Sequence, residues 1–175
     1  NTVTLTTNGD KAYTCTITFT DAAGNTASAL TLTSFTIDTA VSAATESTAV
    51  STPNNDVTPD VVISVAEAGT IAVGGTTGCG LSSTSSMASG SNTVTLATNG
   101  DTGANDDGDS YTCTITFTDA AGNTAGSALN LTAFVIDTVV NTPTETTAVV
   151  TPRPDTTPDV VITTTEAGTI AVGGT

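Results

Sequence analysis

Three cysteines are the most reactive side chains in this 175-residue chain: Cys15, Cys79 and Cys113. The chain contains no histidine. It therefore cannot form a Ser–His or Cys–His nucleophile pair, or the usual imidazole ligation of zinc. Two carboxylates, Glu67 and Asp119, could be considered as a catalytic acid–base pair, but nothing in the sequence fixes the distance between them. We therefore expect the chain not to be an enzyme.

The charge of the chain is strongly negative. The chain has seventeen acidic residues and only two basic residues, Lys11 and Arg153, which gives a formal net charge of −15 at pH 7. Two cations cannot neutralise a phosphate backbone, so we expect no nucleic-acid partner. An anionic membrane surface would repel the chain. The longest apolar run is far shorter than the roughly 18 residues that a transmembrane helix needs, so we expect no membrane insertion.

An internal repeat sets the organisation of the chain. The fifteen residues 13–27 recur without change at 111–125, and the ten residues 67–76 recur at 166–175. The period is thus about 90 to 100 residues, which is too long for one coil of a solenoid and suits one whole domain per repeat.

The proline-rich stretches mark where each repeat begins. Residues 39–59 and 138–158 hold all six prolines, together with many Thr, Ser and Ala, which is typical of linkers merging into a first edge strand. The predicted organisation is the C-terminal half of a repeat at 1–38, a linker at 39–46, a complete repeat at 47–137, a linker at 138–144, and the N-terminal half of the next repeat at 145–175.

The apolar pattern predicts strands. In residues 111–118 apolar side chains and Thr alternate strictly, as they do in residues 93–96, which is typical of strands with one buried and one wet face. Further short strands are predicted at 61–63, 70–73 and 129–136. No segment of 10–12 residues has a helical stripe. We therefore expect an all-β fold of tandem antiparallel β-sandwich repeats, about 90–99 residues each.

The cysteines fit this repeat pattern. The complete repeat contains Cys79 and Cys113, and Cys15 is the counterpart of Cys113. We predict a Cys79–Cys113 disulfide, which would contribute roughly 3–4 kcal/mol for a loop of about 35 residues. Cys15 would then pair with a cysteine outside these 175 residues. The alternative is a pair of buried free thiols in a cytosolic protein.

Several motifs together resemble a known family. Tyr111 stands two residues before Cys113, as in the tyrosine corner of immunoglobulin domains. The closer likeness is to bacterial Ig-like repeats of large secreted surface proteins and adhesins. It is carried by TPDVVIS (58–64), EAGTIAVGG (67–75), CTITFTDAAGNTA (113–125) and FVIDT (134–138). The resemblance implies Ig-like sandwiches strung together outside the cell.

The same resemblance implies calcium at the joints between domains. The candidate ligands are Asp60, Asp119 and Asp137, whose counterparts in the other copies are Asp159, Asp21 and Asp38. Calcium takes six to eight oxygen ligands, which carboxylates and turn carbonyls could supply. The alternative is that these residues are ordinary turn aspartates bonded to their own backbone. The acidic insertion at 105–109 lacks EF-hand spacing and is interpreted as a solvated hairpin tip.

These features favour a structural role. We expect a structural repeat of an extracellular bacterial surface stalk or fibre, with neighbouring copies or adjacent repeats of the same chain as its partners. Residues 145–175 of one copy could complete residues 1–38 of the next, which would give a head-to-tail filament by strand complementation. The alternative is that these residues are a window on a longer array, in which adjacent repeats of the same chain complete both halves. The alternative is an adhesin module that recognises a glycan or a host protein, although no aromatic platform is visible for it.

Overall fold

The computed structural model describes residues 1–101 and 108–174, which form strands and no helix. All the strand pairs in this part of the chain are antiparallel, so the expected all-β class is confirmed. With no helix, the described residues offer none that could cross a membrane. Most of the acidic insertion at 105–109 lies outside the described residues.

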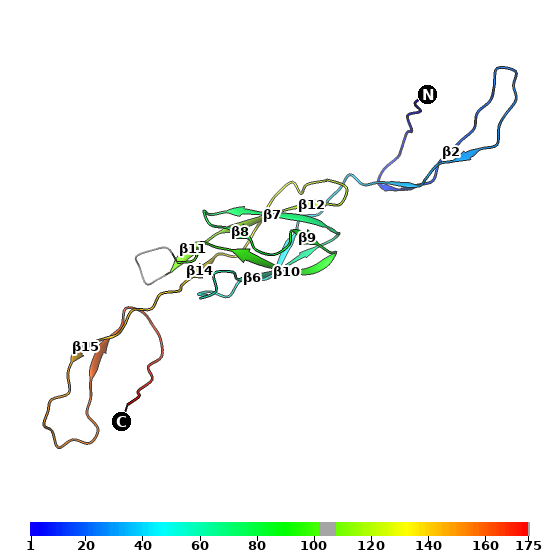
Figure 1. Ribbon diagram of the computed structural model, residues 1–175. Helices are drawn as coiled ribbons and strands as arrows, with labels where there is room; N and C mark the ends of the chain where they lie inside the picture. The colour runs from blue at the N-terminus through cyan, green and yellow to red at the C-terminus, as the bar shows by residue number, and fades with distance from the viewer. Residues whose placement is uncertain (102–107, 175) are drawn as a thin grey trace.

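Two four-stranded sheets and one strand pair make up the central body (Figure 1). One sheet has the order β5-β6-β10-β8 and the other β13-β12-β7-β9, while β11 pairs with β14. The strands are β5 (Thr45–Thr48), β6 (Asp60–Val65), β7 (Gly69–Gly75), β8 (Gly80–Leu81), β9 (Ser86–Met87), β10 (Gly90–Ala97), β11 (Asp109–Tyr111), β12 (Cys113–Asp119), β13 (Leu129–Asn130) and β14 (Phe134–Ile136).

Side chains of both sheets share one hydrophobic core. Ile63 and Val94 come from the first sheet, and Ile115 and Phe117 come from the second. Along β12 the odd positions are buried and the Thr positions between them are partly exposed, as the alternating sequence predicts. The hydrophobic effect of this shared core holds the central body together.

The predicted strand at 111–118 is interrupted at Thr112. The amide of Thr112 donates to the side-chain oxygen Oγ1 of Thr76 at 3.0 Å, and the carbonyl of Thr112 accepts from the Thr76 amide at 3.0 Å. Tyr111 therefore pairs with Phe134 in β14, whereas Cys113 begins the strand that pairs with β7. One sequence pattern thus forms two strands, β11 and β12, which pair with different neighbours.

Strand β5 begins at Thr45, within the predicted linker 39–46. Glu46 fixes this edge strand, because its Oε2 accepts hydrogen bonds from the amide and the hydroxyl of Thr132 at 2.9 and 2.7 Å. The last residues of the stretch between repeats therefore belong to the sheet.

The two ends of the chain leave the central body in opposite directions (Figure 1). The N-terminal part holds two strand pairs, β1-β4 and β2-β3, and the C-terminal part holds the pair β15-β16. Their bounds are β1 (Lys11–Tyr13), β2 (Thr16–Ile17), β3 (Leu30–Thr31), β4 (Phe35–Ile37), β15 (Thr144–Thr147) and β16 (Val161–Thr163).

Candidate functional site

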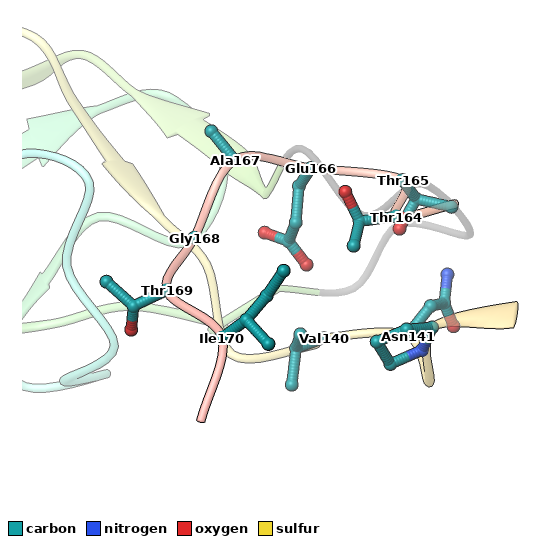
Figure 2. A pocket seen from close by; sticks show the side chains of 10 residues that line it. Val140, Asn141, Thr164, Thr165, Glu166, Ala167, Gly168, Thr169 and Ile170 are labelled. Atoms are coloured by element: carbon teal, nitrogen blue, oxygen red, sulfur yellow. The ribbon is translucent and has the colours of Figure 1, made fainter. Parts of the chain in front are cut away.

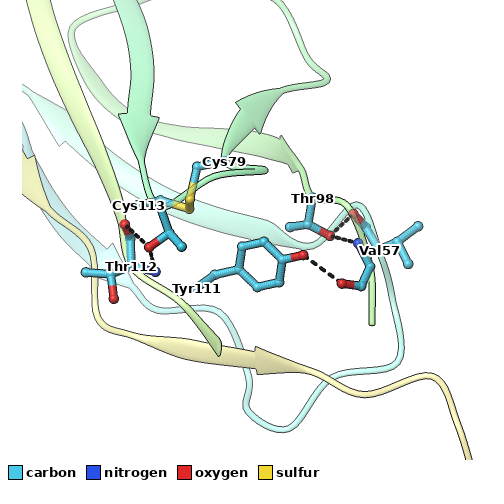
Figure 3. Close-up of a disulfide and its surroundings, with 8 residues drawn as sticks. Val57, Cys79, Thr98, Tyr111, Thr112 and Cys113 are labelled. Carbon is cyan, nitrogen blue, oxygen red and sulfur yellow. Dashed lines mark hydrogen bonds between the residues drawn. A yellow bond between two sulfur atoms is a disulfide. The ribbon is translucent and has the colours of Figure 1, made fainter. Parts of the chain in front are cut away.

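The predicted disulfide is confirmed. Cys79 and Cys113 are joined, with Cα atoms 5.7 Å apart and a sequence separation of 34 (Figure 3). Cys79 directly precedes β8 and Cys113 opens β12, so the bond links the two four-stranded sheets across the core. Cys15 has no disulfide partner in the described residues, and its pairing with a cysteine outside the chain stays a prediction.

Tyr111 anchors the same end of the body. Its buried hydroxyl (Figure 3) donates to the carbonyl of Gly100 at 2.7 Å. Its ring stacks on Phe134, with centroids 5.6 Å apart. Nearby, Thr98 donates to the carbonyl of Val57 at 2.8 Å. A buried Tyr that bonds the backbone upstream of a disulfide cysteine is the arrangement of a tyrosine corner. The contacts of Tyr111 and Thr98 therefore fasten the loops at this end of the body to one another.

Asp119 caps its own turn at the opposite end of β12. Both its carboxylate oxygens accept hydrogen bonds from Asn123, Oδ1 from the amide and Oδ2 from the side chain, each at 2.8 Å. Burial would raise the pKa of the Asp119 carboxyl, but these hydrogen bonds outweigh it and lower the pKa below its ordinary value. The turn is completed by Gly122 at a φ of 95°, where residues with a Cβ are disfavoured.

The same turn lies against the end of the preceding repeat. The Asn123 side chain also donates to the carbonyl of Asp38 at 3.1 Å. Carboxylate oxygens of Asp38, Glu67 and Asp119 all lie within 4.8 Å of one another. Asp38 ends the N-terminal half-repeat, Glu67 lies between β6 and β7, and Asp119 ends β12. We call these three residues the joint carboxylates.

The joint carboxylates are the described residues that could hold a cation between two repeats. Three carboxylates are hard oxygen donors, which suit calcium and do not suit zinc or copper. Carboxylates have several lone-pair sites, so Asp119 keeps acceptor capacity beyond its bonds to Asn123. Calcium takes six to eight oxygens, so carbonyls or water would have to supply the remaining ligands. The donor chemistry therefore fits calcium.

The three aspartates predicted as ligands do not meet at one place in the described residues. Asp119 lies among the joint carboxylates, together with the counterpart of Asp137. Asp60 accepts a hydrogen bond from the Thr95 hydroxyl at 2.7 Å across the β6–β10 pair. Asp137 caps a turn by accepting from the amide of Val139 at 3.3 Å. The hydrogen bonds of Asp60 within the sheet and of Asp137 within its turn are those of ordinary structural aspartates.

Sequence reasoning singled out Glu67 only as half of an acid–base pair. A signal for its place was present, because Glu67 opens the ten-residue segment that recurs unchanged at 166–175. The antiparallel pairing of β7 with β12 brings the loop before β7 close to the turn after β12, and this pairing could not be predicted from the sequence. That proximity follows from the pairing of Asp119 with Gly69 in the β7–β12 ladder.

In comparisons with known proteins, no family model, no curated protein and no solved structure matches this chain.

Proposed function

We propose that the chain is part of an extracellular stalk or fibre built from tandem Ig-like sandwich repeats of bacterial type. The observation that carries the proposal is the linear arrangement: the chain enters the central body at one end and leaves it at the other (Figure 1). A repeat with opposite entry and exit points extends an array along one axis each time it is copied.

The covalent and polar contacts of the repeat support a role outside the cell. Disulfides persist in oxidising surroundings, and Cys79–Cys113 links the two sheets of the complete repeat. The chain offers trypsin-like proteases only Lys11 and Arg153, and Arg153 is followed by proline. A repeat with these properties suits a long-lived surface structure.

The contact between repeats supports stiffness at the joint. The Asn123 side chain donates a hydrogen bond to the Asp38 carbonyl, which connects the turn of one repeat to the end of the preceding repeat. Within this proposal, a calcium ion at the joint would be held by Asp38, Glu67 and Asp119. Calcium would neutralise three neighbouring negative charges that otherwise repel one another.

Electron microscopy of the native protein tests the proposal, with calcium present and after chelation. We expect rods with a domain-sized axial repeat. Rods that bend freely after chelation would place a cation at the joint, whereas rods unchanged by chelation would assign the stiffness to packing and the disulfide. Compact, monodisperse particles under both conditions would contradict the stalk and favour an isolated adhesin module.

A variant pair makes the calcium part specific. Glu67→Gln removes one joint carboxylate, and Glu145→Gln removes an exposed carboxylate of β15 as a charge-matched control. We expect calorimetric titration with calcium to give a weaker signal for Glu67→Gln and an unchanged one for the control. Equal signals in both variants would remove calcium from the joint.

A further inference from the structure

The chain enters the complete repeat along one segment and leaves it along another. The entry segment is residues 45–54, which begins with β5, and the exit segment is residues 132–137, which contains β14. The parts of the chain before and after them leave the central body in opposite directions (Figure 1). A force carried along the chain therefore reaches the body at the start of the entry segment and leaves it at the end of the exit segment.

The chain on either side of these segments connects them to the neighbouring repeats. Before the entry segment, Val41 packs against the core and Ala44 is buried, so the linker is fastened to the body where β5 begins. After the exit segment, the chain continues through Val140, which is the counterpart of Val41, and Asn141 (Figure 2). A pull on either neighbouring repeat is therefore passed on to these two segments.

Backbone hydrogen bonds join the two segments at the end where the chain leaves the body. The amide of Asn54 donates to the carbonyl of Val135, and the amide of Asp137 donates to the carbonyl of Asn54, each at 2.9 Å. The amide of Val135 in turn donates to the side-chain oxygen Oγ1 of Thr52 at 2.9 Å. Asn54 and Ile136 form a parallel bridge. Both backbone polar groups of Val135 are thus bonded to the entry segment.

Glu46 adds a side-chain contact earlier along the same two segments. Its Oε2 accepts hydrogen bonds from the amide and the hydroxyl of Thr132, at 2.9 and 2.7 Å. Hydrogen bonds to a carboxylate are about twice as strong as those between neutral groups. Between Glu46 and the backbone bonds, the side chain of Val50 is buried in the core. The entry segment is therefore tied to the exit segment on both sides of a buried residue.

The contacts come in the same order along both segments, so the two segments run in parallel. A force on the start of the entry segment and on the end of the exit segment acts along the strands, whereas the hydrogen bonds between them lie across the strands. Such a force loads all of the contacts at once. A force on the same end of both segments would instead break the contacts one after another.

We propose that the entry and exit segments form a clamp that keeps the complete repeat folded when the chain is pulled along its axis. The clamp consists of the contacts of Glu46, Thr52 and Asn54 with residues 132–137. Strand β5 also pairs with β6, but β6 lies in the same sheet as β5, whereas β14 belongs to a separate strand pair. The clamp is thus the direct connection between the points where force enters and leaves. The inference rests on the proposed stalk for its biological use.

Optical-tweezers unfolding of the full chain tests the inference. Handles attached through Ala40→Cys and Val139→Cys, in a Cys15→Ala background, pull on the complete repeat from outside both segments. Thr52→Val removes one acceptor with little change of shape, and it should raise the unfolding rate at constant force about fivefold. Glu46→Ala removes two hydrogen bonds to a carboxylate and should raise this rate about tenfold or more.

Thr48→Val is the matched control, because it makes the same substitution at an exposed position of β5. We expect this variant to unfold under load at the rate of the parent. Urea unfolding without load verifies that each variant is folded before it is pulled. Equal rates under load for Thr52→Val, Glu46→Ala and the control would overturn the clamp.

The direction of pulling tests the clamp without changing any of its contacts. Handles at Asn55→Cys and Val139→Cys apply the force to the same end of both segments. We expect the repeat to unfold at a lower force in this geometry than with handles at residues 40 and 139. Equal forces in the two geometries would overturn the inference. Rods seen by electron microscopy despite that result would leave the stalk proposal standing.

Discussion

The same fifteen residues occur twice in this molecule in two different surroundings. Residues 111–125 run through the core of the complete repeat, whereas residues 13–27 lie in the open N-terminal half. Both copies form the Asp–Asn capped turn with the same hydrogen bonds, at distances within 0.1 Å of each other for the two side-chain bonds. The ring of the phenylalanine is buried in one copy and exposed in the other.

This difference separates what is encoded locally from what needs a partner strand. The turn forms in both copies because every atom of it lies within five consecutive residues. The length of the strand, by contrast, differs between the two copies. Strand β12 has seven residues, whereas its counterpart β2 has two. The missing neighbour is the β7-like strand, which supplies the hydrogen bonds and the apolar cover.

Substituting the phenylalanine in each copy should give the largest contrast. Phe117→Ala removes a fully buried ring and should lower the free energy of unfolding by about 3–5 kcal/mol. Phe19→Ala should change it little under dilute conditions, because the ring is exposed. Urea unfolding followed by circular dichroism measures both. Equal losses would mean that the N-terminal half is packed in the single copy.

Removing the disulfide should have the next largest effect. The double variant Cys79→Ala and Cys113→Ala should lose about 3–4 kcal/mol, as the chain-entropy model gives for a loop of this length. Cys15→Ala tests the same cysteine in the open half and should leave the unfolding midpoint unchanged. A large loss for Cys15→Ala would show that its thiol is engaged in the native protein.

Adding one methyl group to Gly69, where β7 lies close against β12, should have a smaller effect. Gly69→Ala forces a Cβ against the backbone of β12 and should destabilise the complete repeat by about 1–3 kcal/mol. Gly168→Ala in the open half should be neutral in the monomer. Thermal unfolding of the two variants at low concentration compares them. Equal destabilisation by both substitutions would mean that Gly168 is packed against a strand as Gly69 is.

The pH dependence should show the smallest contrast. The folded pKa of Asp119 lies below its ordinary value of 3.8. Its contribution to folding is thus fully present above 3.8 and is lost as the pH falls through the folded pKa. Asp119→Asn should flatten this acid limb of the stability curve, measured by urea unfolding across a pH series. Asp21→Asn should flatten it less, because Asp21 caps an exposed turn of the open half, where hydrogen bonds from Asn25, Ala23 and Gly24 lower the pKa of its carboxyl. A curve unchanged by Asp119→Asn would mean that the carboxylate does not titrate with folding.

The alternating sequence was sufficient to predict several features of the fold. Residues 113–119 alternate in burial as their pattern requires, and the repeat arithmetic identified Cys79 and Cys113 as partners. The break at Thr112 could not be predicted, because both the strand before it and the strand after it obey the same period of two. Periodicity reports which face is buried, but not which neighbour each residue pairs with.

The candidate site was predictable only in part. Asp119 was identified from its turn motif, and Asp38 only as the counterpart of Asp137. Glu67 joins them because the β7–β12 ladder places Gly69 opposite Asp119, which is long-range information. Asp60 was predicted as a calcium ligand because it follows a proline near a joint. In the structure, its carboxylate accepts a hydrogen bond from Thr95 on the neighbouring strand.

The bond between Cys79 and Cys113 also limits how far the repeat can lengthen under tension. If a repeat is pulled from both ends until its strands separate, the 34 positions spanned by the disulfide stay closed. At about 3.5 Å per residue, that withholds roughly 120 Å of extension. The acidic insertion lies inside the closed segment, so its extra residues add no slack. A stretched array of such repeats would therefore yield in short steps and recoil over a short distance.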